Sequence, residues 1–234
     1  MNIIIFDTET TGLNAKTNSI VSLGAVDPDR PEDTFYEECR VFDGAEISPD
    51  ALKVNGFDVN EITDVSKQTL KDLYFNFEKY VKSHNADVLS GFNVSRFDLK
   101  FLANTAKRYD LPWELPTKYF DLKDDFEDMI YNNPKFIDLK VQIDRLFPPR
   151  NGNSDPEKKN YISLNRSLKY FGIEDEPRPH NALGGARFAT ELYGLFYLKS
   201  HFLREYDRYP INMAFKDIEF SPKIVSFKYE DFIK

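Results

Sequence analysis

The chain has 234 residues with a hydrophobic content of 41% and an aromatic content of 15%, and its formal net charge is −8. This length and apolar content predict one α/β domain with additions, or one and a half domains, around a packed core. The acidic balance argues against a protein that holds long duplexes by broad phosphate neutralisation, but it is compatible with a nucleic-acid end bound at a local site.

No apolar run approaches the roughly 20 residues that a membrane-spanning helix needs, and the N-terminus lacks the features of a secretory signal. The sequence contains a single cysteine, Cys39, so no internal disulfide can form, which fits a reducing compartment. We therefore expect a cytoplasmic protein without membrane association, in which Cys39 is a small side chain in a strand.

The first expected strand is the apolar run at residues 3–6, which leads directly into Asp7 and Glu9. Side chains alternate across a strand, so these two acids share one face. Carboxylates held side by side raise each other's pKa unless a cation neutralises them. Hard divalent ions such as Mg²⁺ or Mn²⁺ prefer oxygen ligands, so the pair indicates a metal site, with two solvated acids as the alternative.

The remaining chain predicts strands and helices in alternation. Strands at 19–26 and 34–42 complete an antiparallel meander with the first strand. Apolar spacing then favours alternating helices and strands, which together predict an α/β sheet of mixed direction flanked by helices. Up to residue 120, the expected elements are a loop-rich stretch at 43–65, a helix at 66–83, a strand at 86–91, a helix after Ser95 and a proline-broken stretch at 110–120. They are followed by a mostly helical stretch at 121–147 with a short strand near 136–139, and by a loop at 148–160. The last expected elements are helices at 163–170 and 180–204 and a strand-like stretch at 224–229.

Three stretches resemble the motifs of the DEDD superfamily of 3′–5′ exonucleases. The first is FDTETTGL at residues 6–13, the second is GFNVSRFDLKFL at 91–102 with Asn93 and Asp98, and the third is HNALGGA at 180–186, in the histidine form of the DnaQ-like branch. The resemblance implies an RNase H-like mixed sheet, an antiparallel meander followed by parallel strands, flanked by helices. It implies an exonuclease domain at 1–200 and a C-terminal extension at 201–234 that packs on the domain or on a partner.

The same resemblance implies hydrolysis of phosphodiester bonds at 3′ ends of single-stranded DNA or RNA with two Mg²⁺ or Mn²⁺ ions. Asp7 would bridge both ions. Glu9 and the acid of the third motif would hold the ion that carries the attacking water, and Asp98 would hold the other ion, largely through water. His180 would be the general base that accepts the proton of this water.

The third motif departs from the family at one position. Where the family has Asp, five residues after His180, this chain has Gly185, and no acid lies between Pro177 and Thr190. Mg²⁺ requires near-octahedral oxygen ligation, so the ion on the nucleophile side should bind more weakly. The loss of one preorganised electrostatic partner typically costs about 10²–10³ in rate.

Three hypotheses follow for this chain. It is an exonuclease impaired by Gly185, or a catalytically inactive relative that binds nucleic-acid ends or a partner protein, or a working enzyme disabled by deliberate substitution at Gly185. Because Asp7, Glu9, Asp98 and His180 are intact, we favour retained weak activity or a recent or artificial loss over a long-abandoned site.

Four further residues are expected to bind substrate. Thr10 and Leu13 resemble positions that shape the pocket of the terminal nucleotide, with a loop cap and a core plug as their alternatives. Phe57, after Asn55-Gly56, stands where many relatives have a turn that stacks near the terminal base. Asn93 belongs to the second motif.

Several candidates have structural alternatives. Asp98 falls three residues after Ser95, a spacing that is also typical of a helix capping box, and His180 could be an ordinary loop histidine. Asp138 is expected in a structural strand. Basic residues near the pocket would favour a free-standing nuclease, and ordinary surface is the alternative for each; the candidates are Lys53, Arg96, Arg166 and Arg178.

Overall fold

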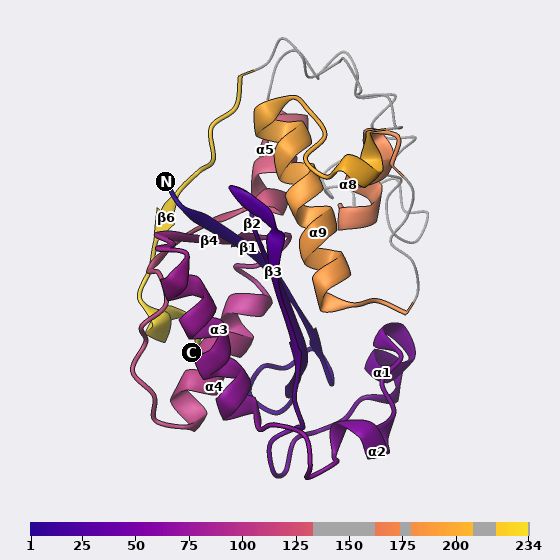
Figure 1. Ribbon diagram of the computed structural model, residues 1–234, viewed down its shortest axis with the longest axis vertical. Coiled ribbons are helices and arrows are strands. Elements are labelled where there is room, and N and C mark those ends of the chain that lie inside the picture. Colours follow the sequence, from indigo (N-terminus) through magenta and orange to yellow (C-terminus); the bar gives the residue numbers. More distant parts are fainter. Residues whose placement is uncertain (133–161, 174–178, 208–218, 234) are drawn as a thin grey trace.

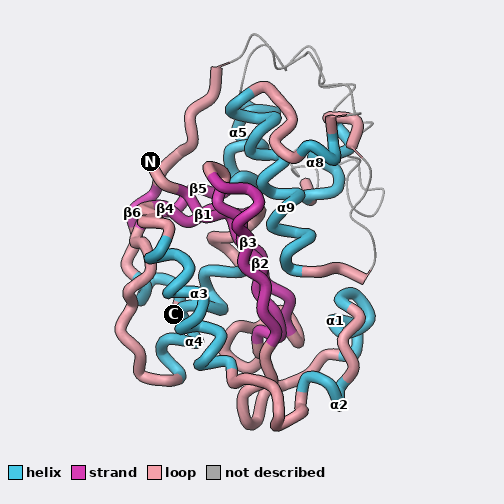
Figure 2. The backbone as a smooth tube through the Cα atoms, in the orientation of Figure 1, coloured by secondary structure: helices cyan, strands magenta, loops and turns pink. Residues whose placement is uncertain are grey.

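A mixed sheet with helices on both faces forms the centre of the molecule (Figures 1 and 2). The computed structural model describes residues 1–132, 162–173, 179–207 and 219–233. Within them the sheet has six strands in the order β3-β2-β1-β4-β5-β6. The strands are β1 (Ile3–Thr10), β2 (Ile20–Asp27), β3 (Arg30–Glu38), β4 (Val88–Gly91), β5 (Lys118–Asp121) and β6 (Val225–Ser226).

The strand directions follow the expected pattern. β1 pairs with β2 and β2 with β3 in antiparallel fashion, and β1 with β4 and β4 with β5 run parallel. The mixed-sheet fold class is therefore confirmed. The helices are α1 (Pro49–Asn55), α2 (Val59–Ile62), α3 (Leu70–Ser83), α4 (Asp98–Arg108), α5 (Leu122–Asn132), α8 (Leu164–Tyr170) and α9 (Ala182–Tyr193), followed by a π-helical turn at Gly194–Leu198 and short 3₁₀ turns at Arg204–Tyr206 and Tyr229–Phe232.

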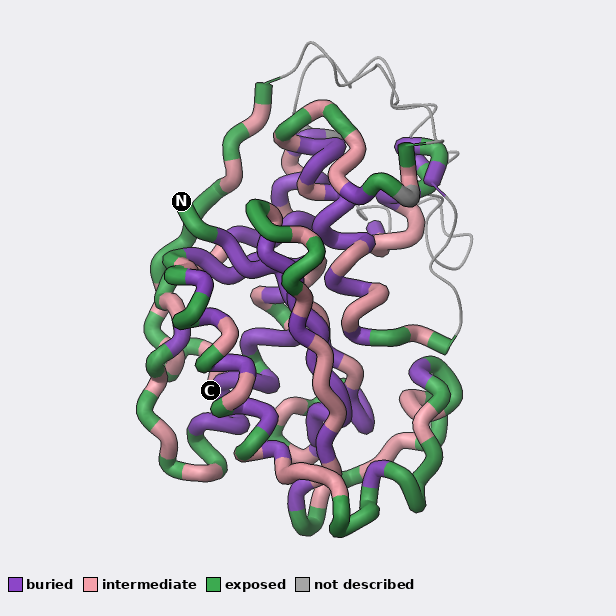
Figure 3. The backbone as a smooth tube through the Cα atoms, in the orientation of Figure 1, coloured by how far each residue is buried: buried purple, intermediate pink, exposed green. Residues whose placement is uncertain are grey.

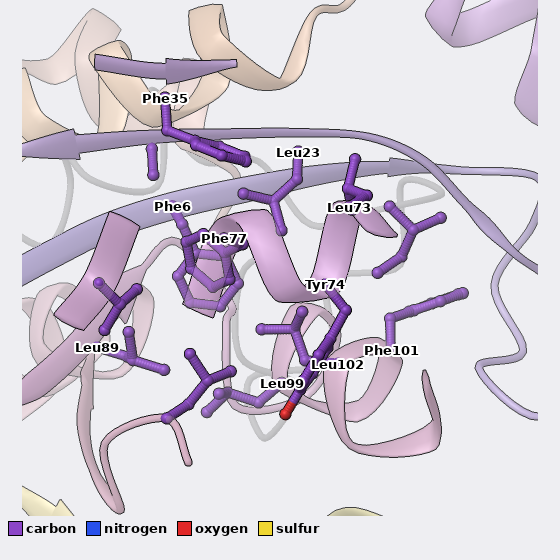
Figure 4. Packing of buried hydrophobic residues seen from close by; sticks show 14 of the residues in the cluster. Phe6, Leu23, Phe35, Leu73, Tyr74, Phe77, Leu89, Leu99, Phe101 and Leu102 are labelled. Atoms are coloured by element: carbon purple, nitrogen blue, oxygen red, sulfur yellow. The ribbon is translucent and has the colours of Figure 1, made fainter. Parts of the chain in front are cut away.

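β1 separates two apolar clusters, because its side chains alternate between the faces of the sheet. Ile4 and Phe6 pack with residues of α3 and α4, and Figure 4 shows Phe6 beside Phe77 of α3. Ile3 and Ile5 pack with residues of α5, α8 and α9. Figure 3 shows buried backbone along the central strands and exposed outer surfaces. By the same alternation, Asp7 and Glu9 follow Ile3 and Ile5 on the face of β1 that α9 covers.

Several elements differ from the sequence-based expectation. Residues 43–65 contain α1 and α2. Ser48 accepts a hydrogen bond from Ala51 N–H, which is a helix start signal, and Gly56 at φ +76° ends α1. β5 forms within 110–120 because the chain pairs with β4 soon after Pro116.

The last long helix ends earlier than expected. α9 passes after Tyr193 into the π-helical turn at Gly194–Leu198, and the helical path ends where Lys199 adopts φ +57°. Glu191 is fully buried, and its carboxylate accepts hydrogen bonds from the backbone of Phe202 and Leu203. These bonds hold the returning chain against the helix. The expected strand at 136–139, with Asp138, and the loop at 148–160 lie outside the described residues.

The loop between β4 and α4 is held by Asp121, the last residue of β5. Its carboxylate accepts hydrogen bonds from Asn93 N–H (2.8 Å), Ser95 N–H (3.0 Å) and Ser95 Oγ (2.7 Å). Asn93 adopts φ +68°, a left-handed conformation that this bonding supports. Asp121 thereby fixes the segment that leads into Asp98, the first residue of α4. The expected cap at Ser95 is wrong, because its hydroxyl bonds Asp121 and α4 begins three residues later.

The C-terminal residues lie against the sheet and α4. β6 pairs with β5 through two residue pairs in antiparallel fashion. The Tyr229 ring stacks on Trp113 with centroids 5.8 Å apart, and Phe227 and Phe232 contact Tyr119. Cys39 is a buried free thiol. Across the described segments, no helix is both long and apolar enough to cross a membrane.

We predict that Asp121→Ala lowers the free energy of unfolding by about 3 kcal/mol, because it leaves backbone donors of the β4–α4 loop without their acceptor. The matched control is Asp124→Ala, which removes a surface ion pair with Arg96 and should cost less than about 1 kcal/mol. Urea unfolding followed by circular dichroism measures both. Equal losses in the two variants would contradict the anchoring role of Asp121.

Candidate active site

Asp7 and Glu9 lie at the end of β1 on the face that α9 covers. Both are half-buried, while Thr8 between them is buried on the opposite face. In the antiparallel ladder Asp7 is paired with Gly24 and Glu9 with Ser22. The structure thus brings the two carboxylates of the first motif onto one surface, as their spacing predicted.

The first turn of α9 rests directly on this strand pair. A Cβ atom built on Gly24 would lie 2.2 Å from Leu183 N, so only glycine permits this approach of the helix backbone. Asn181 caps the helix by accepting hydrogen bonds from Leu183 N–H and Gly184 N–H, both at 3.1 Å. α9 therefore begins at the position of Asp7, and its N-terminal partial positive charge lies close to that carboxylate.

Gly185 is the residue of α9 that meets Asp7. A Cβ atom built on Gly185 would lie 2.4 Å from Asp7 Oδ2 and 2.8 Å from Asp7 Cγ. The third-motif position therefore lies where the resemblance implies, beside the first acid of the chain. It also means that the Asp7 side chain occupies the space which a side chain at position 185 would need.

Asp98 lies on the other side of β1. Its Oδ1 accepts hydrogen bonds from Thr8 N–H (3.0 Å) and Thr8 Oγ1 (2.6 Å), and the residue is only 2% exposed. Burial raises the pKa of Asp98, and the hydrogen bonds from Thr8 oppose this shift. The capping-box alternative is wrong, because the residue that caps α4 is Phe97 and no side chain bonds the helix start.

His180 lies beside the C-terminal end of α1. Its backbone N–H donates to Val54 O at 3.1 Å, and a Cβ atom on Gly56 would lie 2.6 Å from Pro179 Cβ. Asn55 Nδ2 donates to Thr10 O at 3.1 Å and so ties α1 to the end of β1. The turn after α1, the first motif and the segment before α9 therefore meet at one end of the sheet, as Figure 1 shows for α1 and α9.

The four residues expected to bind substrate have different surroundings. The Thr10 hydroxyl donates to Gly12 O at 2.7 Å, which is the loop-cap arrangement. Leu13 is 88% exposed, so its core-plug alternative is wrong. The Phe57 ring lies 5.8 Å from Lys67 Nζ. Asn93 is held through its backbone by Asp121.

The metal-binding capacity of the site is limited in this arrangement. Among the residues that the structure describes, no group of three or more His, Cys, Asp or Glu side chains is placed to hold a metal ion. Asp7 and Glu9 supply oxygen donors of the type that Mg²⁺ prefers, but Asp98 bonds Thr8 and position 185 has no side chain. The donors fit one weakly held hard cation better than a complete two-ion centre.

Two residues that hold the site were missed by sequence reasoning. Thr8 lies between the two acids and anchors Asp98, and Asp121 anchors the second motif. The signal for Asp121 was its position in YFDL at 119–122, an aromatic and apolar run ending in Asp-Leu like the FIDL at 136–139. Pro112 and Pro116 precede this run, and they favoured an irregular stretch over a strand.

We predict that Gly24→Ala lowers the free energy of unfolding by about 1–3 kcal/mol, because the new methyl group meets backbone atoms of α9 that cannot rotate away. Gly185→Ala should cost less, since the Asp7 carboxylate can move and Ala favours a helix by about 1 kcal/mol. Guanidinium unfolding measures both, with Lys79→Ala on the exposed surface of α3 as the control. A neutral Gly24→Ala would contradict the close approach of α9.

The chain is similar to known nucleases. The family model RNase T, described as an exonuclease, matches residues 4–193. Similar relatives include ribonuclease T of Pectobacterium atrosepticum, 30% identical over 129 residues that cover 46% of this chain and 53% of the relative. The epsilon subunit of DNA polymerase III from Treponema pallidum is 35% identical over 100 residues, 42% of each chain. The chain thus spans about half the length of the curated relatives it matches.

Solved structures share the fold. The nuclease domain of 3′hExo, a DEDDh family member bound to rAMP, gives a TM-score of 0.61 at 16% identity and covers 87% of this chain and 94% of that one. Exonuclease I of E. coli in complex with a dT13 oligonucleotide gives 0.64 at 17% identity, with 88% of this chain and 42% of that chain covered. These likenesses confirm the RNase H-like fold class.

The family match includes all three motif stretches and most of the chain. The resemblance to DnaQ-like exonucleases is therefore confirmed, and the chain belongs to the RNase T family of exonucleases.

Proposed function

We propose that this protein is a metal-dependent 3′–5′ exonuclease that removes nucleotides from single-stranded DNA or RNA, with activity reduced by Gly185. The observation that carries the proposal is the pair Asp7 and Glu9 on the face of β1 that meets the third-motif position of α9. Relatives named ribonuclease T and a neighbour solved with a dT13 oligonucleotide support a nucleic-acid substrate.

Each residue of the site has a proposed role. Asp7 and Glu9 hold Mg²⁺ or Mn²⁺, which when bound activates water and stabilises the leaving oxygen. Asp98 would hold a second ion, largely through water, while Thr8 orients its Oδ1. His180 accepts the proton of the attacking water. Thr10, Leu13, Phe57 and Asn93 hold the terminal nucleotides, and Leu13 offers an exposed apolar side chain for base contact.

A second candidate function is binding of nucleic-acid ends, or of a partner protein, without hydrolysis. The observation that favours it is the incomplete ligand set, because Gly185 contributes no carboxylate and Asp98 is held by Thr8. In that case the fold and the pocket persist while the metal centre does not assemble.

The deciding experiment restores the missing acid. We predict that Gly185→Asp raises the Mn²⁺-dependent shortening of a 5′-labelled 20-nucleotide single strand by about 10²–10³, the usual effect of one preorganised partner. The double variant Gly185→Asp with Asp7→Asn is the control and should lose this gain. No hydrolysis in any form would contradict the exonuclease and leave the binding function, whereas equal rates with Gly and Asp would contradict the impairment.

The same variant should also change how metal affects stability. In EDTA, Gly185→Asp brings a second carboxylate against Asp7, so the melting temperature should fall below that of the chain with Gly185. Added Mn²⁺ should raise the melting temperature of Gly185→Asp more than that of the chain with Gly185, because the ion binds the folded form. Differential scanning fluorimetry measures this shift. An equal Mn²⁺ effect in both proteins would contradict a metal site shared by positions 7 and 185.

A further inference from the structure

Three neighbouring hollows run along the exposed side of α4. The first, of about 210 Å³, includes Leu13 and Phe97 in its wall, and the second and third have about 370 Å³ and 360 Å³. Lys16 and Asn104 line both the first and the second hollow, and Arg108 lines both the second and the third. Each hollow thus shares lining residues with the next, and the three together are here called the basic track.

The charge of the basic track is opposite to that of the whole chain. Its lining includes a single acid, Asp43, although the chain has 39 acidic and 31 basic residues. The basic residues that line it are Lys16, Arg40, Lys71, Arg96, Lys100, Lys107 and Arg108. A cationic path on an acidic protein is the electrostatic footprint expected for a phosphate backbone.

α4 sets the spacing of these cations. Lys100, Asn104, Lys107 and Arg108 fall at helical positions i, i+4, i+7 and i+8, which share one face. The helix rises about 12 Å from the first to the last of them, at about 1.5 Å per residue. Phosphates of a strand are about 3.4 Å apart along the axis of a duplex and farther apart in an extended single strand, so this stretch of α4 faces a few phosphates.

Most of the cations are available to a ligand. Within the described segments, Lys16, Lys71, Lys100 and Lys107 form no ion pair with an acid. Arg40 Nε is buried without a hydrogen-bond partner in the same part of the chain. A buried donor of this kind is costly unless an acceptor reaches it, and a phosphate oxygen is such an acceptor.

Arg108 is held in place beside the path. The centre of its guanidinium group lies 3.4 Å from the ring centroid of Phe42, and Nη2 donates to Lys16 O at 2.8 Å. Stacking on an aromatic ring leaves a guanidinium edge open to further hydrogen bonds. Among the described residues, Arg96 is the one cation of the track that pairs with an acid, Asp124, and it lies at the opposite end of the path.

The first hollow of the basic track lies at the end of α4 that is nearer the acids. Phe97 in its wall directly precedes Asp98, which bonds Thr8 of β1, and Leu13 in its wall follows the loop at the end of β1. At the other side, the C-terminal residues Phe232 and Ile233 form part of the wall, and Asn104 Nδ2 donates to Phe232 O at 3.4 Å. A strand whose 3′ end lies at Asp7 would pass around the end of β1 to bring its preceding nucleotides to this path.

We propose that the nucleotides 5′ of the terminal residue bind along the basic track, with their phosphates on the lysines of α4 and on Lys16, Arg40, Lys71 and Arg108. The proposal rests on the proposed function for the position of the 3′ end. Affinity would then depend on strand length, because a short 3′ end reaches only Asp7, Glu9 and the first hollow. A longer strand also engages the second and third hollows.

The test measures binding of single strands in EDTA by fluorescence anisotropy, with 5′-labelled oligothymidylates of 3 and 12 nucleotides. The double variant Lys16→Gln with Lys107→Gln removes two cations of the second hollow. Single strands show a slope of log affinity against log salt of about −0.7 per phosphate contact, so the slope for the 12-mer should become shallower by about 1.4 and its affinity at 0.1 M salt should fall about 20-fold. The 3-mer should change less than about twofold. The matched control is Lys79→Gln with Lys118→Gln, exposed lysines on α3 and β5, which should leave both unchanged.

The outcomes separate this proposal from the proposed function. Equal losses for the 3-mer and the 12-mer, or no loss for either, would overturn the basic track. If a 12-residue poly-glutamate peptide, and no oligonucleotide, loses affinity in the double variant, the surface binds an acidic protein segment and the proposal is wrong. Failure of Gly185→Asp to hydrolyse, together with length-dependent binding, would overturn the nuclease and leave the track.

Discussion

The candidate site depends on the close packing of α9 on the strand pair β1–β2. Gly24 lets the backbone at Leu183 approach to a distance that no side chain would allow, and this places Gly185 against Asp7. A shift of the helix by the width of one methyl group would separate the third motif from the first. The position of Gly185 is therefore set by Gly24 on the neighbouring strand β2, a residue without a functional group of its own.

The second motif depends on a different set of contacts. Asp98 is joined to β1 through Thr8, and its loop is joined to β5 through Asp121. Buried carboxylates that accept several hydrogen bonds are rigid as long as every donor is present. The acids of the candidate site thus come from opposite faces of β1, and Thr8 holds Asp98 through a single carboxylate oxygen, Oδ1.

Residue patterns within a short stretch of sequence predicted the strands and helices whose structure is set within that stretch. The alternation at 3–10 placed Asp7 and Glu9 together, and the helical spacing at 66–83 gave α3. β5 was missed because its identity comes from pairing with β4, and α9 was predicted too long because the helical path ends where Lys199 adopts φ +57°. The contact of Asp98 with Thr8 is set by tertiary structure, so no local pattern in the sequence predicts it.

The short pairing of β6 with β5 has a consequence for how the protein would work on a polymer. Two residue pairs and a few aromatic contacts hold the segment that ends in Phe232 and Ile233. Without this segment, one side of the path beside α4 would be open. In the proposed exonuclease, the acids and the path that would hold the strand are therefore separate parts of the fold, so a change in the C-terminal segment would alter strand binding without altering the acids.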